Sequence, residues 1–171
     1  EDLVITVAFA ESWNRARLKG LDLFVKIADL LPEVKFVVIG ATGEALSKLT
    51  SISSKNVEFI KPLSQNELLT YYQKAKVYCQ LSMHEGLPNA LCEAMLCECV
   101  PVGTEVNGIP KVIGNTGFYV PYGNIEDVVE AINQALISNN GKKARKRIKE
   151  MFTVEKREQT VHKIINKVIS E

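Results

Sequence analysis

Short β-branched runs alternate with helix-periodic segments along this sequence, and this alternation constrains its fold more than any other feature. The runs are almost continuously apolar, and Gly, Pro, Asn and Ser separate them from the segments that follow. Apolar strands of this kind are buried on both faces, which is typical of a parallel sheet covered by helices. We therefore expect an α/β fold, a Rossmann-like three-layer sandwich with a parallel sheet of about six strands. The predicted strands span residues 3–9, 34–40, 56–60, 76–82, 99–103 and 117–120.

The segments between these strands show the local signals of helices. Residues 21–31, LDLFVKIADLL, keep their apolar side chains on one face at helical spacing. A later segment opens with Ser64-x-x-Glu67, the pattern of a capping box at a helix N-terminus. From about Ile125 onward the sequence looks wholly helical, and it ends in a C-terminal helical segment at 141–171. A chain of 171 residues suits a single domain that buries roughly 70 % of its unfolded surface.

Composition and charge exclude several classes of function. The 21 Lys and Arg residues and the 20 Asp and Glu residues give a formal charge of +1, so the chain as a whole implies no nucleic acid and no acidic partner. No apolar run reaches the roughly 18 residues of a membrane span, and no secretory signal is present. We therefore expect a cytoplasmic domain. The sequence lacks an initiating Met and begins directly at a strand, which suggests a piece of a longer protein.

The four cysteines are expected to be reduced and to serve as small buried side chains, because they lie in apolar surroundings. Cys97 and Cys99 form a Cys-Glu-Cys pattern that is compatible with zinc. However, no second Cys or His pair lies at the spacing of a zinc finger. The sequence also contains no Asp-x-Asp motif. We therefore expect no metal site.

The segment GKKARKRIKE, residues 141–150, concentrates six basic residues in ten. Such a run is compatible with an anionic membrane surface, with nucleic acid or with a solvated helix face. The solvated face is favoured because no aromatic side chain is interleaved to insert into lipid or to stack on bases. Contact with a membrane surface stays open, and nucleic acid is not expected. The last helix places apolar side chains at helical spacing, so we expect it to dock on an apolar surface of this domain or of another one. These residues are Val161, Ile164, Ile165 and Val168.

The loops that follow the strands are the expected place for chemistry, because ligands of such folds bind outside the carboxyl ends of the strands. The loop after the first strand lacks G-x-G-x-x-G, which argues against a dinucleotide site, and the segment after the second strand lacks the Gly-Lys-Ser end of a P-loop. The first loop is basic instead. Arg15, Arg17 and Lys19 precede the first expected helix, where they either share an anion with free backbone amides or remain exposed loop charges.

The stretch HEGLPNALCEAM, residues 84–95, combines two glutamates with the start of a helix. Pro88 suits a first helical turn, so Glu85 belongs to the preceding loop and Glu93 to the second turn. The first amides of a helix are free to bind phosphate, whereas a carboxylate repels phosphate and accepts hydrogen bonds from hydroxyls. Hydroxyls, phosphate and hydroxyls follow one another in a sugar nucleotide, as hexose, diphosphate and ribose. Besides the glutamates, the residues expected to line this ligand are Gly86, Leu87, Asn89, Ala90 and Leu91.

Both glutamates also have a structural interpretation. Glu85 is compatible with the far half of a Ser82-x-x-Glu85 capping box, and Glu93 with a surface charge. Gly86 and Pro88 would lie inside the first turn of that capped helix. They weaken this interpretation, because neither residue favours the interior of a helix.

EGLPNALCEAM resembles the E-x₇-E signature of retaining glycosyltransferases of family 4, which lies in the nucleotide-sugar-binding C-terminal half of the two-domain GT-B fold. The resemblance covers nearly the whole chain. LKGLDLFVKIADLLPEVKFVVIG is similar to the family's K-G-x-D-x-L helix and following strand, and CVPVGTEVNGIPKVI is similar to its P-V…G-I-P-E segment. TGFYVP and NIEDVVEAINQAL are similar to the T-G-F-L-V strand and the helix after it.

The resemblance implies a role for each glutamate. Glu85 would orient the hexose of the donor, and Glu93 would bind the hydroxyls of the ribose. Backbone groups of the segment from Lys61 to Leu63 would lie near the nucleotide base. These roles agree with the order of groups that the motif itself suggests.

The resemblance also implies that Lys19 and an upstream arginine neutralise the leaving diphosphate. In the family, that arginine commonly belongs to a G-R dipeptide at the end of the first strand, and this dipeptide is absent here. Arg15 is therefore the first choice and Arg17 the second. Lys111 replaces the usual glutamate after Gly-Ile-Pro, which affects the expected geometry of that loop.

We thus expect residues 1–171 to be the donor domain of a metal-independent glycosyltransferase that transfers a hexosyl group with retention from a UDP-, GDP- or ADP-linked sugar. No further cofactor is expected. The acceptor-binding half, normally N-terminal, is missing from these residues, so the isolated domain should bind its donor without turnover. The location is expected to be cytoplasmic, or at the cytoplasmic membrane surface.

Two other classes of function fit the same residues. A nucleotide-sugar epimerase of the same two-domain architecture would share the phosphate and ribose sites, and it would invert a sugar in the absence of any acceptor. A non-catalytic module that binds sugar nucleotides would bind the ligand and never react.

Overall fold

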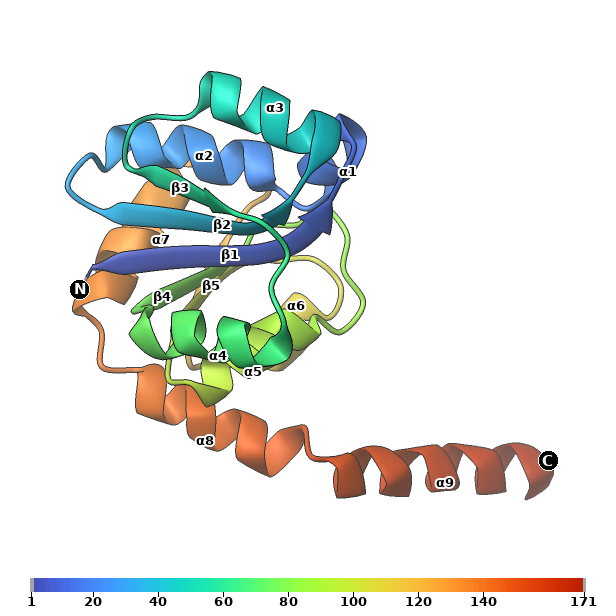
Figure 1. Cartoon of the computed structure of the whole chain (residues 1–171). Helices are drawn as coiled ribbons and strands as arrows, with labels where there is room; N and C mark the ends of the chain where they lie inside the picture. The colour runs from blue at the N-terminus through green and yellow to red at the C-terminus, as the bar shows by residue number, and fades with distance from the viewer. Residues whose placement is uncertain (1, 171) are drawn as a thin grey trace.

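In the computed structural model, which describes residues 2–170, parallel strands form one sheet with helices on both faces (Figure 1). The order of the strands is β3-β2-β1-β4-β5-β6. The expected α/β three-layer sandwich is confirmed, because every pair of neighbouring strands in the six-stranded sheet is parallel. The strands are β1 (Leu3–Ala10), β2 (Lys35–Ala41), β3 (Val57–Ile60), β4 (Val77–Gln80), β5 (Val100–Thr104) and β6 (Phe118–Val120).

The chain adds β2 and β3 on one side of β1 and the later strands on its other side. After β3 the chain returns to the free side of β1 and adds β4, β5 and β6. The carboxyl ends of β1 and β4 therefore form the switch point of the sheet, and folds of this kind bind ligands in a crevice outside such a point. All six predicted strands are observed, and β4 ends earlier than predicted because residues 81 and 82 belong to the loop that follows it.

The helices in the described residues are α1 (Trp13–Leu18), α2 (Leu21–Leu30), α3 (Gly43–Ile52), α4 (Gln65–Lys74), α5 (Asn89–Leu96), α6 (Ile109–Ile113), α7 (Ile125–Ile137), α8 (Gly141–Met151) and α9 (Val154–Ser170). The capping box predicted from the sequence is present at the start of α4. There the amide of Ser64 donates to Glu67 Oε2 at 2.8 Å, and the amide of Glu67 donates back to Ser64 Oγ at 3.4 Å.

Helix α1 corrects the expectation that Arg15 and Arg17 precede the first helix. The backbone of Ser12 is extended, and its Oγ accepts a hydrogen bond from the amide of Arg15 at 3.3 Å, so a helix begins directly after β1. Both arginines lie within this helix. Lys19 caps its C-terminus, and Gly20, at a φ of 70°, turns the chain into α2.

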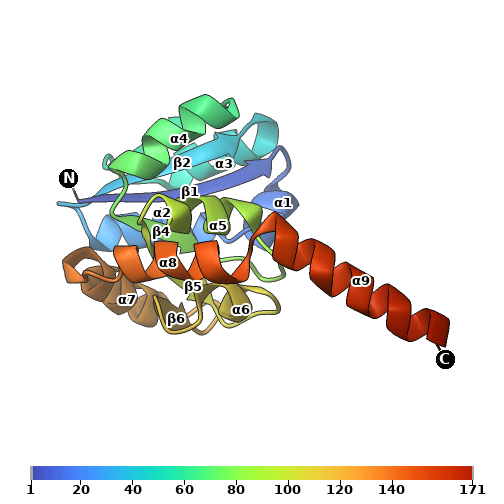
Figure 2. The ribbon, with the colours of Figure 1, turned by 90° about the horizontal axis from the view of Figure 1, so that it is seen from below.

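Each face of the sheet is covered by an apolar cluster. Helices α1, α2, α3 and α7 contribute to one cluster, in which Phe24 meets Phe36 of β2 edge to face at 5.2 Å. Helices α4, α5, α6 and α8 contribute to the other, in which Tyr72 meets Tyr78 of β4 at 6.1 Å. Figure 2 shows α5 and α8 side by side beneath the sheet. Both faces are therefore closed, and the strand ends remain as the place for a ligand.

Helix α9 projects away from the sandwich (Figures 1 and 2). Residues 154–169 are all exposed, including the apolar residues that the sequence places on one face of this helix. Val161, Ile165 and Val168 thus have no apolar surface to dock on within residues 2–170. Of the two expectations for this face, docking on the same domain is wrong.

Candidate functional site

At the carboxyl edge of the sheet, the loops that follow β1 and β4 contact each other through their backbones. The amide of Met83 donates to the carbonyl of Leu18 at 2.9 Å. A Cβ atom on Gly20 would lie 2.0 Å from the carbonyl oxygen of Leu81, so only glycine permits this approach. The junction of α1 and α2 is therefore fixed against the loop after β4, and Lys19 is held beside that loop.

Lys19 and Glu85 form an ion pair across this junction. The Nζ atom of Lys19 lies 2.6 Å from Oε2 of Glu85, and their side chains are only 18 % and 16 % exposed. Ser82 Oγ and Gln80 Nε2 donate to the same oxygen at 3.3 and 3.5 Å. Within residues 2–170 no group donates to Oε1 of Glu85. The carboxylate is thus fixed through one oxygen, and the other is left to accept a hydrogen bond.

The residues that support Glu85 are buried at the end of β4. Ser82 and Thr104 are fully buried and Gln80 nearly so, and Thr104 Oγ1 donates to the carbonyl of Ser82 at 2.7 Å. Gln80 Nε2 donates to Ser82 Oγ at 2.8 Å, while its Oε1 accepts from the hydroxyl of Tyr78 at 3.3 Å. Sequence analysis missed this network, although a glutamine inside an otherwise apolar strand signals a buried polar partner.

Helix α5 begins between the two glutamates, as the sequence predicts. Its N-cap is Pro88, and no side chain caps it. The first backbone bond runs from the amide of Cys92 to the carbonyl of Pro88, at 3.3 Å, so the three preceding amides have no partner within the helix. The alternative capping box is wrong, because no helix begins at Ser82, although its hydroxyl does contact Glu85. The three free amides belong to Asn89, Ala90 and Leu91.

The segment between Glu85 and α5 is fixed by the loop that follows β5. The amide of Gly108 donates to the carbonyl of Glu85 at 3.4 Å. A Cβ atom on Gly108 would lie 1.7 Å from the carbonyl oxygen of Gly86, so the two backbones are in direct contact. By contrast, the space beside the Cα of Gly86 is open and Leu87 is 48 % exposed. This segment therefore presents a fixed, accessible backbone to the crevice.

Glu93 lies in the second turn of α5 and is half-buried. The hydroxyl of Tyr72, on α4, donates to its Oε2 at 3.3 Å. Burial and the charge of Glu93 raise the pKa of Tyr72 far above its usual range, so this phenol keeps its proton. From Asn89 to Glu93 the helix rises about 6 Å, which is a plausible reach from a phosphate to a ribose diol.

The two arginines of α1 are exposed and form neither hydrogen bonds nor ion pairs through their side chains within the part of the chain that the structure describes. Arg17 lies near the loop after β6. Tyr122 belongs to that loop. Burial and the charge of Asp22 raise the pKa of its hydroxyl, and the nearby positive charge of Arg17 lowers it. Both cations are accessible, and the structure does not bring either one to Glu85.

The segment predicted to approach a nucleotide base lies at the same edge of the sheet. Lys61 and Leu63 belong to the loop between β3 and α4. Lys61 is exposed, whereas Leu63 packs partly against the apolar cluster beneath α4.

Asp22, in the first turn of α2, has a buried Oδ1 atom without a hydrogen-bond partner in residues 2–170.

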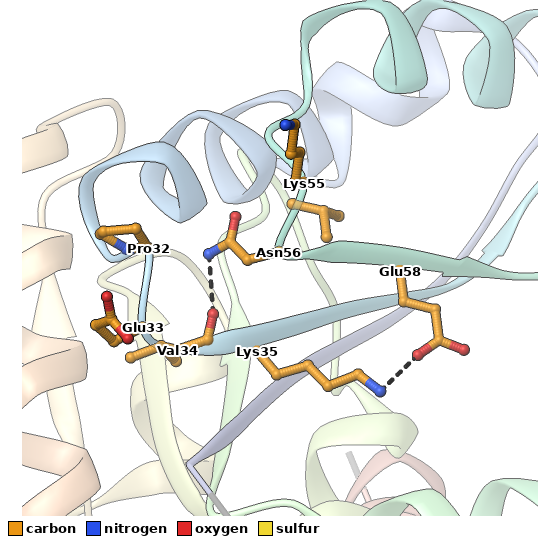
Figure 3. Close-up of a pocket in the computed structure, with 8 residues that line it drawn as sticks. Pro32, Glu33, Val34, Lys35, Lys55, Asn56 and Glu58 are labelled. Carbon is orange, nitrogen blue, oxygen red and sulfur yellow. Dashed lines mark hydrogen bonds and ion pairs between the residues drawn. The ribbon is translucent and has the colours of Figure 1, made fainter.

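A second hollow lies at the opposite edge of the sheet, where β2 and β3 begin (Figure 3). It is lined by residues 32–35 and 55–58. Asn56 Nδ2 donates to the carbonyl of Val34 at 2.9 Å, and Lys35 pairs with Glu58 at 2.8 Å. These contacts tie β3 to β2, and the side chains of the Lys35–Glu58 pair are about half exposed. This hollow contains none of the residues of the crevice.

The cysteines are free thiols and form no metal cluster. Cys79 and Cys99 are buried, and burial raises the pKa of Cys92 to about 11. Within the described residues, no group of three or more His, Cys, Asp and Glu side chains is placed to hold a metal ion. The same residues contain no helix that is both long and apolar enough to span a membrane.

Comparison with known sequences finds one matching family and several relatives. Residues 10–152 match the family described as glycosyl transferases group 1. The chain is 28% identical over 131 residues to the D-inositol 3-phosphate glycosyltransferase of Mycobacteroides abscessus, an alignment that covers 70% of this chain and 30% of that protein. It is 27% identical over 176 residues to the trehalose synthase of Thermococcus litoralis, with 90% and 41% covered. The chain thus spans less than half of the length of these relatives.

Solved structures show the same fold. The sucrose-phosphate synthase of Thermosynechococcus elongatus superposes with a TM-score of 0.78 at 20% identity, over 98% of this chain and 45% of that one. A glycosyltransferase of Rickettsia africae superposes with a TM-score of 0.80 at 14% identity, over 98% and 48%. TarM superposes with a TM-score of 0.79 at 21% identity, over 97% and 34%. The sandwich is therefore the fold of one half of the GT-B architecture.

Proposed function

Because the chain belongs to the family of glycosyl transferases group 1, we propose that it is a donor domain that binds a nucleoside-diphosphate sugar in the crevice between β1 and β4. The proposal includes transfer of a hexosyl group with retention and without a metal ion. The observation that supports it best is the arrangement around the start of α5. Along the chain, two carboxylates, each fixed through one oxygen, precede and follow three amides that have no partner within α5.

The proposed ligand follows the order of these groups. The diphosphate binds the amides of Asn89 to Leu91, where the dipole of α5 favours negative charge. Glu85 accepts a hydrogen bond from the hexose through its unoccupied oxygen, and Glu93 binds the hydroxyls of the ribose. The base lies against the backbone of residues 61–63.

We propose that Lys19 acts on the diphosphate although it already pairs with Glu85. An ammonium group has three donors, so Lys19 can keep its bond to Glu85 while it donates to a phosphate oxygen. Negative charge builds up on the diphosphate as the sugar departs, and preorganised donors stabilise it without reorganisation. Arg15 or Arg17 supplies a further positive charge from α1. We propose that these cations, rather than a metal ion, neutralise the leaving group.

The complete transferase needs a second domain in this proposal. A donor site without a facing domain neither positions an acceptor nor excludes water. We propose that an acceptor-binding domain of the same protein closes it, as the GT-B architecture implies. The uncovered apolar face of α9, with Val161, Ile165 and Val168, is the surface that this domain would cover.

Helix α8 supports a further part of the proposal, a contact with an anionic membrane surface. It contains six Lys and Arg residues against one Glu. Arg147 is committed to the fold, since it donates to the carbonyls of Val112 and Lys111 at 2.7 and 2.8 Å. In contrast, Lys142 and Lys143 are exposed and form no ion pair within residues 2–170. Basic residues of this kind each contribute about 1 kcal/mol near an anionic lipid surface.

Vesicle sedimentation tests the membrane contact. The chain should sediment with phosphatidylcholine vesicles that contain phosphatidylglycerol and not with phosphatidylcholine alone, and added salt should weaken the binding. The double variant Lys142→Glu/Lys143→Glu should sediment less. Equal binding to neutral vesicles would indicate insertion of the α9 face instead, and no binding to either would refute the contact.

Calorimetry and thermal melting test the donor site. In the presence of a chelator, one of UDP, GDP and ADP should bind the chain, and at a hundredfold excess over its Kd it should stabilise the fold by about 2.7 kcal/mol. Lys19→Ala should weaken this effect, whereas Lys142→Ala, on α8, should not. A melting temperature that no nucleoside diphosphate shifts at millimolar concentration, or that shifts only with a metal ion, would contradict the proposal.

A further inference from the structure

We propose that Tyr72 is a positioning residue that holds the Glu93 carboxylate in place for the ribose, an inference that rests on the proposed function. Tyr72 lies on α4, 21 residues before Glu93, and its hydroxyl donates to Oε2 of Glu93 at 3.3 Å. Neither the sequence motif around Glu93 nor the loops of the crevice include this residue. It acts through Glu93, which it contacts from the neighbouring helix α4.

The ring of Tyr72 is fixed by its surroundings. The residue is 2 % exposed, and its ring meets that of Tyr78 at an interplanar angle of 62°. Its backbone carbonyl accepts a hydrogen bond from the thiol of Cys99 at 3.1 Å, which ties the end of α4 to the start of β5. A ring that is almost fully buried cannot turn its hydroxyl away. The hydroxyl therefore has one fixed direction, toward Glu93.

The hydroxyl of Tyr72 is also suited to act as a donor. Burial and the charge of Glu93 raise the pKa of this phenol far above its usual range, so it keeps its proton at neutral pH and donates to Glu93 Oε2. Within residues 2–170 no group donates to Glu93 Oε1, so this oxygen is left to accept a hydroxyl of the ligand.

The arrangement lowers the entropy that ligand binding must remove. A glutamate on a helix surface samples several rotamers, and fixing such a side chain on binding weakens affinity. Tyr72 has already fixed Glu93 when the chain is folded. Loss of the tyrosine hydroxyl should therefore weaken the binding of a ribose-containing ligand by about two- to tenfold, with no effect on a ligand that lacks the hydroxyls.

The test compares Tyr72→Phe with the parent chain by calorimetry in chelator, with whichever of UDP, GDP and ADP binds the parent most tightly. The Kd should rise about two- to tenfold. The 2′,3′-dideoxy form of the same nucleotide should bind both chains equally, because it offers no ribose hydroxyl to Glu93. In a Glu93→Ala background, Tyr72→Phe should have no further effect, which a general loss of packing would not reproduce.

Tyr119→Phe is the matched control. The hydroxyl of Tyr119 donates to the backbone carbonyls of Pro110 and Gly114, away from Glu93, and its removal should leave the Kd unchanged. If the parent binds no nucleoside diphosphate, the proposed function fails and this inference fails with it. If the parent binds and Tyr72→Phe binds as tightly, or if the variant weakens the dideoxy form equally, the positioning role is refuted while the donor site stands.

Discussion

Removal of Lys19 should destabilise the fold, because the charged carboxylate of Glu85 would lose its cationic partner. In Lys19→Ala the Glu85 carboxylate, 16 % exposed, keeps only the donors of Ser82 and Gln80. Breaking a buried ion pair by removal of one partner costs about 3–5 kcal/mol. The pair is not fully enclosed and two neutral donors remain, so we expect a loss of about 1–3 kcal/mol.

A double-mutant cycle separates this interaction from the packing of the lysine stem. Glu85→Gln removes the charge in place, and Lys19→Met keeps the length of the side chain without its ammonium group. The double variant should be more stable than the two single losses predict, with a coupling free energy of at least about 1 kcal/mol. The exposed pair of Lys146 and Glu150, at 3.8 Å, is the matched control and should couple by less than about 0.5 kcal/mol.

Urea unfolding followed by circular dichroism measures these free energies at low and high salt. The coupling of Lys19 with Glu85 should persist in about 0.5 M NaCl, because a mostly buried pair is weakly screened. Strictly additive effects of the two substitutions would refute the reasoning, as would a Lys19→Ala variant as stable as the parent. Either result would mean that the two side chains are not held together in solution.

Three further predictions concern the loop after β5, the need for a facing domain and the thiol of Cys92. Gly108→Ala should lower the free energy of unfolding by about 2 kcal/mol or more in urea titrations, since its Cβ would lie 1.7 Å from a backbone oxygen, whereas Gly86→Ala, which meets open space, should change it little. The purified chain should transfer no sugar to an added acceptor in a product assay, and sustained transfer would contradict the need for a facing domain. The rate at which iodoacetamide alkylates Cys92, followed by mass spectrometry, should keep rising with pH until the pH nears the thiol pKa of about 11. A rate that levels off near the pKa of a free thiol would contradict the burial of Cys92.

The elements of the fold were predictable where local pattern and tertiary packing agree. The apolar runs that become β2 and β5 are buried along almost their whole length, so burial on both faces is visible in the composition of the strand itself. Helix α1 was not predicted, because six residues with one buried side chain have too little apolar periodicity to be distinguished from a loop. Its only local signal is the serine that caps it.

The site was predictable where its signal is local. The start of α5 between Glu85 and Glu93 follows from Pro88 and the spacing alone. The pairing of Lys19 with Glu85, 66 residues apart, depends on the close approach of Gly20 to the loop after β4, and no local pattern encodes this approach. The partners of the two glutamates, Gln80 and Tyr72, lie outside the motif and the loops to which sequence analysis assigned the chemistry, so their polar atoms were overlooked.

The donor-site proposal places ribose and hexose on different glutamates, so the two substitutions should have different effects on two ligands. Glu93→Ala should weaken a nucleoside diphosphate and its sugar conjugate by a similar factor, since both contain the ribose. Glu85→Ala should spare the nucleoside diphosphate and weaken only the conjugate. A hydrogen bond to a charged group contributes about 1.5–3 kcal/mol, so each loss should be on the order of ten- to a hundredfold.

Calorimetric titration of the parent chain and these two variants with both ligands is the most direct measurement of this arrangement. The predicted result is a loss for both ligands in Glu93→Ala and for the conjugate alone in Glu85→Ala, with the fold of both variants intact by circular dichroism. If Glu93→Ala binds the nucleoside diphosphate as tightly as the parent does, the ribose does not lie on α5 and the proposed donor site is wrong.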